Sequence, residues 1–444
     1  MTRKSTPIST RLLGDKLFGA IRSDFEKIAD LRQQGKVTIP LTDALMSGFA
    51  MFSLKVPSLL HFHEETKNEA VAHNLTSIYK INQLCSDTQM RTIVDPVAPE
   101  ALRASFKTIF NQVEQDGGLK QFKFLGRYFL ASMDGTGYFS STNVSCPNCQ
   151  TKINKTTGQI SYSHAMLGIA LVHPDRKEVI ALAPEPIIKQ DGTSKNDCER
   201  NAAKRLLEKL KTDHPDLPLI ITEDALSPNA PHISELKRHD FRFILGVKEG
   251  DHKFLFSSVQ EKKLAGETTK FEIEKDGVIH RFHYINSVPL NESNQDLLVN
   301  FLEYWEIKGT ETKYFSWVTD IEISTTNVYW LMKGGRARWK IENETFNTLK
   351  NQGYKLEHNF GHGYKNLSVN FALLMMLAFL VDQVQEIGCQ VFQAALEKKG
   401  RRIRLWNNIK AYFYTLFFDS WKMLLEAILY GIKIKGFTIL YNTS

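Results

Sequence analysis

The chain has 444 residues, more than one ordinary hydrophobic core needs, so two or three domains are expected. Hydrophobic residues make up 42% and charged residues 24%, which excludes a disordered chain and indicates an ordinary globular protein. The formal net charge of +7 is a mild excess that is compatible with a polyanionic partner without requiring one. Five cysteines are too few for a disulfide framework, so a reducing cytoplasmic compartment is expected.

No membrane association is expected from the sequence. The first ten residues are polar and show no apolar stretch of the kind found in a signal peptide. The most apolar run, Val369 to Val381, contains Asn370 and is shorter than the roughly 20 residues that cross a bilayer. This run predicts a buried helix.

The first 120 residues predict a helical region, in which DNA-end binding is one interpretation, because Ala, Leu and Phe recur at helical spacing. From residue 121 to 249 the pattern changes to strands, first three in succession and then alternating with helices. The predicted strands are Phe124–Met133, His164–Val172, Glu178–Ala183, Leu217–Thr222 and Phe241–Val247, with helices from Asn196 or Asp197 to Lys211 and from Pro231. This order predicts an α/β fold with a mixed sheet and flanking helices.

Residues 250–326 predict a β-rich insertion, with a hairpin over Lys270–Ile285 that turns at Asp276-Gly277 and a further strand over Tyr314–Ile323. Residues 327–365 return to the core. There Asn327 can cap a helix that Gly334-Gly335 should break, and a strong helix should run from Arg336 to Asn351. The remainder, 366–444, predicts a helical C-terminal region.

Two aspartates follow predicted buried strands, which is where ligands bind in open α/β sheets. Asp134 precedes Gly135-Thr136-Gly137, and Asp224 precedes Ala225. Turn formation is the commoner explanation for either residue alone. Glu223 adds an ambiguity, but strand alternation sends Glu223 and Asp224 to opposite faces, so only one of them can join a shared site.

The predicted helix from Arg336 carries two glutamates. On a helical wheel that starts at Trp339, Glu342 falls between the apolar positions Phe346 and Leu349, so its carboxylate should point into the protein. Glu344 falls on the opposite side, with Lys340 as a surface partner. A buried carboxylate is costly unless it is paired with a cation or binds a metal. Arg338 lies four residues before Glu342, so an ion pair between them is the alternative to metal binding.

Together, Asp134, Asp224 and Glu342 predict a site for Mg²⁺ or Mn²⁺, since hard carboxylate oxygens suit hard cations. Such a site can hold two ions that clamp the attacking and leaving oxygens of a phosphoryl displacement. Water or a DNA 3′-hydroxyl then serves as the nucleophile.

These segments resemble the DDE insertion-sequence transposases, which have a ribonuclease H-like core and a β-rich insertion. The resemblance is carried by Asp134-Gly135-Thr136, Glu223-Asp224-Ala225-Leu226, Arg338-Trp339-Lys340-Ile341-Glu342-Asn343, Leu349-Lys350 and Glu357-His358-Asn359-Phe360-Gly361-His362-Gly363. It implies cleavage at transposon ends and strand transfer into target DNA, with Asp134, Asp224 and Glu342 as catalytic metal ligands.

The related group has a Tyr-Arg-Glu-Lys signature on its last catalytic helix. Arg338 and Glu342 keep the expected spacing, whereas Gly335 takes the Tyr position and Lys350 comes one residue late. Contacts to DNA are expected from Arg338, Lys350, Arg336, His358 and His362. The resemblance also implies double-stranded DNA as partner, a homodimer that holds two ends, and a bacterial cytoplasmic location on the nucleoid.

A second metal site is suggested by Cys146-Pro147-Asn148-Cys149, which has the two-residue gap of a zinc knuckle. His164 and Cys198 could complete a structural Zn²⁺ site if this loop folds back over the sheet. The alternative is a set of reduced thiols.

Three other functions stay open. A nuclease of the same fold would cut DNA without joining it. A DNA-binding protein descended from a transposase would be catalytically silent, although it would have little reason to keep all three acids. A zinc-stabilised interaction protein would leave Glu342 without a role.

Overall fold

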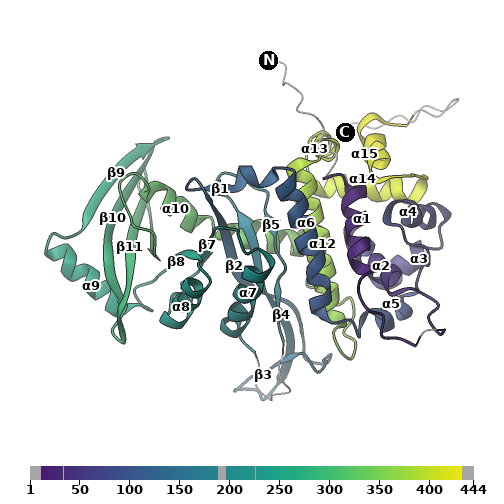
Figure 1. The fold of residues 1–444 in the computed structure, drawn as a ribbon, viewed down its shortest axis with the longest axis horizontal. Coiled ribbons are helices and arrows are strands. Elements are labelled where there is room, and N and C mark those ends of the chain that lie inside the picture. The colour runs from purple at the N-terminus through teal and green to yellow at the C-terminus, as the bar shows by residue number, and fades with distance from the viewer. Residues whose placement is uncertain (1–11, 34, 189–196, 226, 433–444) are drawn as a thin grey trace.

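The computed structural model describes residues 12–33, 35–188, 197–225 and 227–432. A continuous mixed sheet runs through one half of the molecule, and a body of helices forms the other half (Figure 1). The predicted α/β class with a mixed sheet and flanking helices is therefore confirmed. Asn196, one of the two residues predicted to cap a helix, lies outside the described residues.

The sheet contains twelve strands within the described residues, and its main path runs β3-β4-β2-β7-β8-β12-β11-β10-β9. Strand β2 pairs antiparallel with β4 and parallel with β7, which pairs parallel with β8. The bounds are β1 Lys123–Phe124, β2 Tyr128–Ser141, β3 Gln150–Ile153, β4 Ile160–Val172, β5 Ile180–Ala181, β6 Glu185–Ile187, β7 Leu219–Glu223, β8 Arg242–Gly246, β9 Thr269–Lys275, β10 Val278–Asn291, β11 Asn294–Lys308 and β12 Glu311–Thr319.

The helical body contains helices from both the N-terminal and the C-terminal part of the chain. Its N-terminal helices are α1 Gly14–Phe25, α2 Leu41–Ser53, α3 Leu59–Glu65, α4 Glu69–Tyr79, α5 Asp87–Val94 and α6 Arg103–Gln115. Its C-terminal helices are α12 Leu367–Gly388, α13 Gln390–Lys399, α14 Arg402–Thr415 and α15 Trp421–Tyr430. Helix α12 packs against α2 and α6 and also against β5, so it links this body to the sheet.

Helix α12 is long and apolar enough to cross a membrane, but 94% of its most apolar window is buried inside the protein. It contains the apolar run Val369–Val381, which was predicted to form a buried helix, and that prediction is confirmed. Asn370 is tolerated in this helix because its side-chain amide donates to the carbonyl oxygens of Val94 and Val97, each at 2.9 Å.

Further helices follow α6 and precede α12 in the sequence. They are α7 Glu199–Asp213, α8 Ala230–Arg238, α9 Lys253–Leu264, α10 Val328–Arg336, a π-helical turn Ile341–Phe346 and α11 Asn347–Asn351. Helix α8 begins where the Asn229 side chain accepts a hydrogen bond from the His232 backbone N–H at 3.1 Å, a standard N-cap. Helices α7 and α8 pack on each other beside β4 and β8, respectively.

The predicted β-rich insertion is continuous with the core sheet. Strands β9 and β10 form the hairpin that turns at Asp276-Gly277, and both residues adopt the positive φ that such a turn requires. Strand β12 then pairs with β8 of the core. The insertion therefore lengthens the central sheet, as the left half of Figure 1 shows.

A helix break was predicted at Gly334-Gly335, and α10 ends directly after them at Arg336, although both glycines lie inside the helix. The glycines instead allow close packing. A Cβ on Gly334 would lie 2.9 Å from the Phe124 ring, and one on Gly335 would lie 2.4 Å from the Trp317 indole nitrogen. Both distances are shorter than van der Waals contact.

A Gly335→Ala variant should therefore lose about 1–3 kcal/mol of folding free energy, because the added methyl group must displace the rigid Trp317 ring. Gly19→Ala is the matched control, since Gly19 is also helical and nothing lies within 4 Å of its added Cβ. The control should gain up to about 1 kcal/mol from helix propensity. Urea unfolding measures both effects, and an equal gain in the two variants would contradict the packing argument.

The prediction from the helical wheel that the Glu342 carboxylate points into the protein is wrong. Trp339 is 55% exposed, so the wheel began on an outward-facing residue. The chain also forms a π-helical turn over Ile341–Phe346, which has more residues per turn than the wheel assumes. As a result, the side chain of Glu342 is 42% exposed and is not buried as predicted.

Candidate functional site

Asp134 lies inside a strand and not in a turn after one. Strand β2 continues through Gly135-Thr136-Gly137 to Ser141, and Asp134 pairs with Gly168 on β4. A Cβ on Gly168 would lie 2.7 Å from the Phe346 ring. The glycine thus lets the π-helical turn settle directly on β2 and β4, and this brings the segment with Glu342 to the strand with Asp134.

Arg338 connects two of the three predicted acids. Its Nη1 lies 2.6 Å from Glu342 Oε1 and 3.3 Å from Asp134 Oδ2. The Arg338 side chain is only 13% exposed, so this bridge is partly shielded from water. The Arg338 backbone is held as well, because Ser132 Oγ on β2 donates to its carbonyl oxygen at 2.8 Å. Arg338 is therefore the ion-pair partner that the sequence suggested for Glu342, and it pairs with Asp134 at the same time.

The surroundings of Asp134 favour its protonated form. Burial raises the pKa of Asp134 to about 7, and the adjacent Glu342 carboxyl adds to this effect, while the Arg338 charge opposes it. A carboxyl with such a pKa beside a second carboxyl is typical of functional sites. Arg338 offsets part of the repulsion between the two carboxylates, and a further cation or a proton would offset the rest.

An Asp134→Asn variant should gain stability relative to the wild type as the pH rises. The pKa of Asp134 is about 7 in the folded chain and about 4 in an unfolded one. The cost of ionising it in the fold is therefore absent near pH 4, grows as the pH rises and is complete above about pH 7. In unfolding experiments with EDTA, the advantage of the variant should be larger at about pH 8 than at about pH 5, by on the order of 1 kcal/mol. An advantage that does not change with pH would contradict this assignment.

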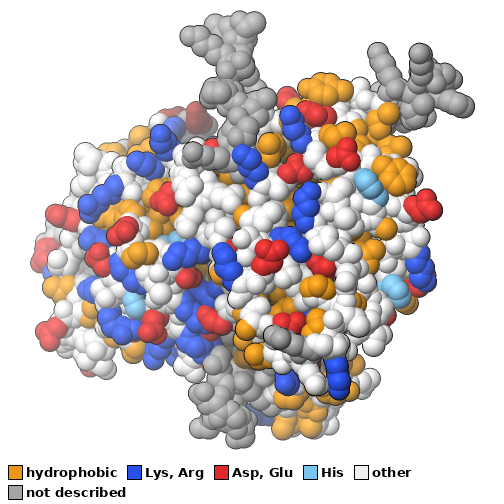
Figure 2. Space-filling model, turned by 45° about the vertical axis from the view of Figure 1, so that its right-hand side comes forward, with side chains coloured by type: hydrophobic (Ala, Val, Ile, Leu, Met, Phe, Trp, Pro, Cys, Tyr) orange, Lys and Arg blue, Asp and Glu red, His pale blue; other side chains and the backbone are white. Residues whose placement is uncertain are grey.

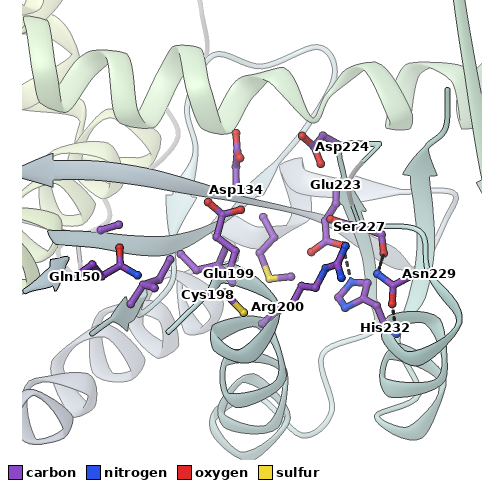
Figure 3. Close-up of a pocket in the computed structure, with 15 residues that line it drawn as sticks. Asp134, Gln150, Cys198, Glu199, Arg200, Glu223, Asp224, Ser227, Asn229 and His232 are labelled. Carbon is purple, nitrogen blue, oxygen red and sulfur yellow. Dashed lines mark hydrogen bonds and ion pairs between the residues drawn. The ribbon is translucent and has the colours of Figure 1, made fainter. Parts of the chain in front are cut away.

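Glu223 and Asp224 take opposite sides, as strand alternation predicted. Glu223 ends β7 and is 5% exposed, with its Oε2 2.6 Å from Nε2 of His232 on α8. Burial alone would lower the pKa of His232, but the Glu223 charge and hydrogen bond outweigh it and raise that pKa. In Figure 3 Glu223 points toward His232, whereas Asp224 and Asp134 point to the other side of the strands. Asp224 is therefore the member of this pair that faces the side of Asp134.

A fourth acid near this site, Glu199, was missed by the sequence analysis. Glu199 is the first residue of α7, and a Cβ on Gly135 would lie 2.1 Å from its Oε1. Burial raises the pKa of Glu199, and the charges of Asp224 and Glu223 raise it further. No strand end or motif marks Glu199 in the sequence, because it reaches the site only through the packing of α7.

These acids line a cavity of about 580 Å³ beside the sheet (Figure 3). Its walls include Asp134, Glu199, Glu223, Asp224 and His232. A neighbouring cavity of about 430 Å³ also includes Asp224, together with Arg338 and Trp339. Asp224 thus lies between the two cavities.

The three predicted acids share this region without forming one closed coordination sphere. Among the described residues, a single group of three or more His, Cys, Asp or Glu side chains brings its ligand atoms within 4.8 Å of one another. That group consists of Cys146, Cys149, His164 and His362. Asp134 and Glu342 are joined through Arg338, and Asp224 faces the same side of the sheet.

The cysteine loop lies where the sequence analysis proposed a second metal site, but with a different fourth member. Cys146, Cys149 and His164 meet as expected, and His362 completes the group. Cys198 lies outside it, exposed at the N-terminus of α7 on the wall of the larger cavity. The spacing between Cys149 and His362 is so long that no local pattern in the sequence could connect them.

The residues expected to contact DNA lie in different environments. Arg336 pairs with Glu306, and Lys350 lies 2.8 Å from Glu357 Oε1. His358 is exposed, whereas His362 is buried in the cysteine–histidine group. The buried position of His362 removes it from direct contact with DNA.

No family model matches the chain, and no curated protein matches it.

Proposed function

We propose that this chain is a DDE transposase that cuts DNA at transposon ends and transfers the cut strands into target DNA. The observation that carries the proposal is the meeting of Asp134 on β2 with Glu342 from a distant helix, bridged by Arg338. Asp224 faces the same side of the sheet from the end of the neighbouring parallel strand. Acids from distant segments of the chain therefore lie on one side of the sheet, and such an arrangement supports a catalytic role.

The sheet order supports a ribonuclease H-like core. The first long strand, β2, lies between β4, with which it is antiparallel, and the later parallel strands β7 and β8. The resemblance in the sequence implies this arrangement, with one acid on the first strand and one after the fourth. It also implies a β-rich insertion before the glutamate helix, and β9 to β12 occupy that place in the chain.

The donor groups fit Mg²⁺ or Mn²⁺. Asp134, Asp224 and Glu342 offer hard carboxylate oxygens of the kind that these cations prefer. When bound, the ions would polarise the scissile phosphate and activate the attacking oxygen. The three acids would hold the ions, and Arg338 would orient Asp134 and Glu342 and contribute positive charge beside the phosphate.

The departure from the Tyr-Arg-Glu-Lys signature has a structural reason. At Gly335, which takes the Tyr position, the space for a side chain is filled by the Trp317 indole from β12. Trp317 and the exposed Trp339 both line the cavity that includes Asp224 and Arg338. An aromatic surface next to the acids is therefore retained, although it comes from other positions.

The surface charge is compatible with a DNA partner. Figure 2 shows Lys and Arg side chains on the drawn face, more densely at its lower left, with Asp and Glu side chains between them. Cations that contact phosphate would make the affinity fall with rising salt concentration. We propose further that the protein acts in the cytoplasm as a homodimer on paired transposon ends.

The proposal is tested with the full-length protein, a duplex carrying the terminal sequences of its own element and a labelled target duplex. With Mg²⁺ or Mn²⁺ we expect 3′-hydroxyl ends and a joined product, and neither should form in EDTA. Cleavage without joining would instead favour a nuclease. Binding without either reaction would identify a catalytically silent DNA-binding protein and overturn the proposal.

A further inference from the structure

Two cysteines and two histidines from three separate segments lie close together at β4. Cys146 and Cys149 lie in the loop between β2 and β3, His164 lies on β4, and His362 precedes α12. The exposed fractions are 1% for Cys149, 0% for His164 and 9% for His362, while Cys146 is partly exposed. Burial of the two imidazoles is costly unless their polar nitrogen atoms have partners.

Of four distances between the ligand atoms, three lie close to those around a tetrahedral ion, and the distance from His362 to Cys149 is shorter. The two sulfur atoms lie 3.8 Å apart, and His164 Nε2 lies 3.3 Å from Cys146 Sγ and 3.5 Å from Cys149 Sγ. His362 Nε2 lies 3.0 Å from Cys149 Sγ. With Zn–S bonds of about 2.3 Å and Zn–N bonds of about 2.0 Å, tetrahedral geometry gives about 3.8 Å between sulfurs and about 3.5 Å from sulfur to nitrogen. A disulfide would require about 2.05 Å between the sulfurs.

We propose that Cys146, Cys149, His164 and His362 bind one structural Zn²⁺ ion. Thiolate and imidazole ligands select zinc over the hard cations that carboxylates prefer. Four protein ligands also leave no open position for substrate, which distinguishes a structural zinc from a catalytic one. The site shares no residue with Asp134, Asp224 or Glu342, so it does not depend on the proposed function.

The orientation of both imidazoles supports this assignment. The Nε2 atoms of His164 and His362 are turned to the sulfurs, as ligation requires, whereas their buried Nδ1 atoms have no hydrogen-bond partner among the described residues. Aromatic rings enclose the group, with the Phe139 ring centroid 4.2 Å from that of His362 and Tyr138 stacked on His164 at 5.7 Å. Such a shell excludes water from the ion and fixes the rings.

The ion would connect a segment that follows the glutamate helix to the antiparallel strands β2 and β4. Nearby contacts hold the same segment, since Asn148 Nδ2 donates to the Lys365 carbonyl oxygen at 2.6 Å. The Asp95 carboxylate accepts the backbone N–H groups of Tyr364 and Leu367, each at 2.9 Å. Zinc would therefore stabilise the connection between the sheet and α12.

The first test is the metal content of the full-length protein, purified under reducing conditions from zinc-supplemented cells. We expect one zinc per chain in the wild type and in the Cys198→Ser control, whose exposed thiol lies outside the group. Cys146→Ser should lower zinc affinity by more than about 100-fold, since even outer-shell changes cost 10–100-fold. A wild type that neither retains zinc nor binds added zinc after reduction would overturn the proposal.

The second test separates loss of zinc from loss of folding. Cys146 is the ligand that is only partly buried, so Cys146→Ser should keep the far-ultraviolet circular dichroism of the wild type while its Tm falls. Wild type loaded with Co²⁺ should show the visible bands of a tetrahedral site and thiolate charge transfer, and Cys146→Ser should not. An octahedral Co²⁺ spectrum, or an unchanged spectrum in Cys146→Ser, would overturn the assignment. Neither readout depends on DNA cleavage or joining.

Discussion

An Asp382→Ala variant should lose about 3–5 kcal/mol of folding free energy, because it leaves a buried lysine without its counterion. Asp382 on α12 pairs with Lys55, which follows α2, and the two side chains are 2% and 1% exposed. Tyr354 also donates its hydroxyl to Asp382. Lys55 also contacts the Ser53 carbonyl oxygen at 2.8 Å, the Trp406 ring at 3.7 Å and the Tyr354 ring at 4.5 Å.

Burial acts on both members of this pair. It lowers the pKa of Lys55 and raises the pKa of Asp382, while their mutual attraction opposes both changes. When Asp382 is removed, the Ser53 carbonyl oxygen and the Trp406 ring still contact the ammonium group, but its directly paired counterion is gone. Lys55 must then lose its proton or draw water into the junction of α2, α12 and α14, and either response destabilises the fold.

Denaturant unfolding at neutral pH measures this loss. Glu272→Ala is the matched control, because Glu272 pairs with Arg281 at 2.7 Å on the surface, where both side chains are about half exposed. The control should change the free energy of unfolding by less than about 1 kcal/mol. Equal losses in the two variants would show that the buried pair contributes no more than a surface pair. A Lys55→Met, Asp382→Leu double variant should recover much of the loss, because no isolated charge remains.

A Glu342→Gln variant should lose strand cleavage and joining by on the order of 10³-fold while its stability changes little. The amide keeps the shape of the side chain and can still accept a hydrogen bond from Arg338, but it removes the charge that would hold a divalent ion. Since Glu342 is 42% exposed, its removal leaves no buried cavity. The fall should therefore appear in the rate of the chemical step and not in the amount of folded protein.

Glu344→Gln provides the control on the same helical turn. Glu344 lies two residues after Glu342 and is also partly exposed. Burial lowers the pKa of the nearby Lys340, and the Glu344 charge opposes this effect. This variant should cleave and join DNA at close to the wild-type rate. Equal activity of Glu342→Gln and wild type would mean that Glu342 serves only as a partner of Arg338.

Short-range patterns in the sequence predicted most of the sheet. The alternation of side chains along β7 separated Glu223 from Asp224 correctly, because that period depends only on the local backbone. The hairpin turn at Asp276-Gly277 was predicted for the same reason. The full length of β2 was not predicted, because Asp134-Gly135-Thr136-Gly137 resembles a turn when it is considered alone. Its pairing with β4 keeps it extended.

Features set by packing could not be predicted from local patterns. The wheel for the glutamate helix assumed a regular period, whereas the π-helical turn over Ile341–Phe346 changes it where Phe346 meets Gly168. The double glycine before Arg336 suggested a helix break, but no local pattern indicated its close contacts with Phe124 and Trp317. Glu199 and His362 reach their sites only after distant elements have packed together.

The formation of a strand-joined product in Mg²⁺ or Mn²⁺ tests whether Asp134, Asp224 and Glu342 bind the catalytic ions, and it is measured for wild type and for Asp134→Asn, Asp224→Asn and Glu342→Gln. We expect metal-dependent joining by the wild type and its loss in each of the three variants. Joining at the wild-type rate by any folded variant of the three would contradict the assignment of these acids as the metal-binding site.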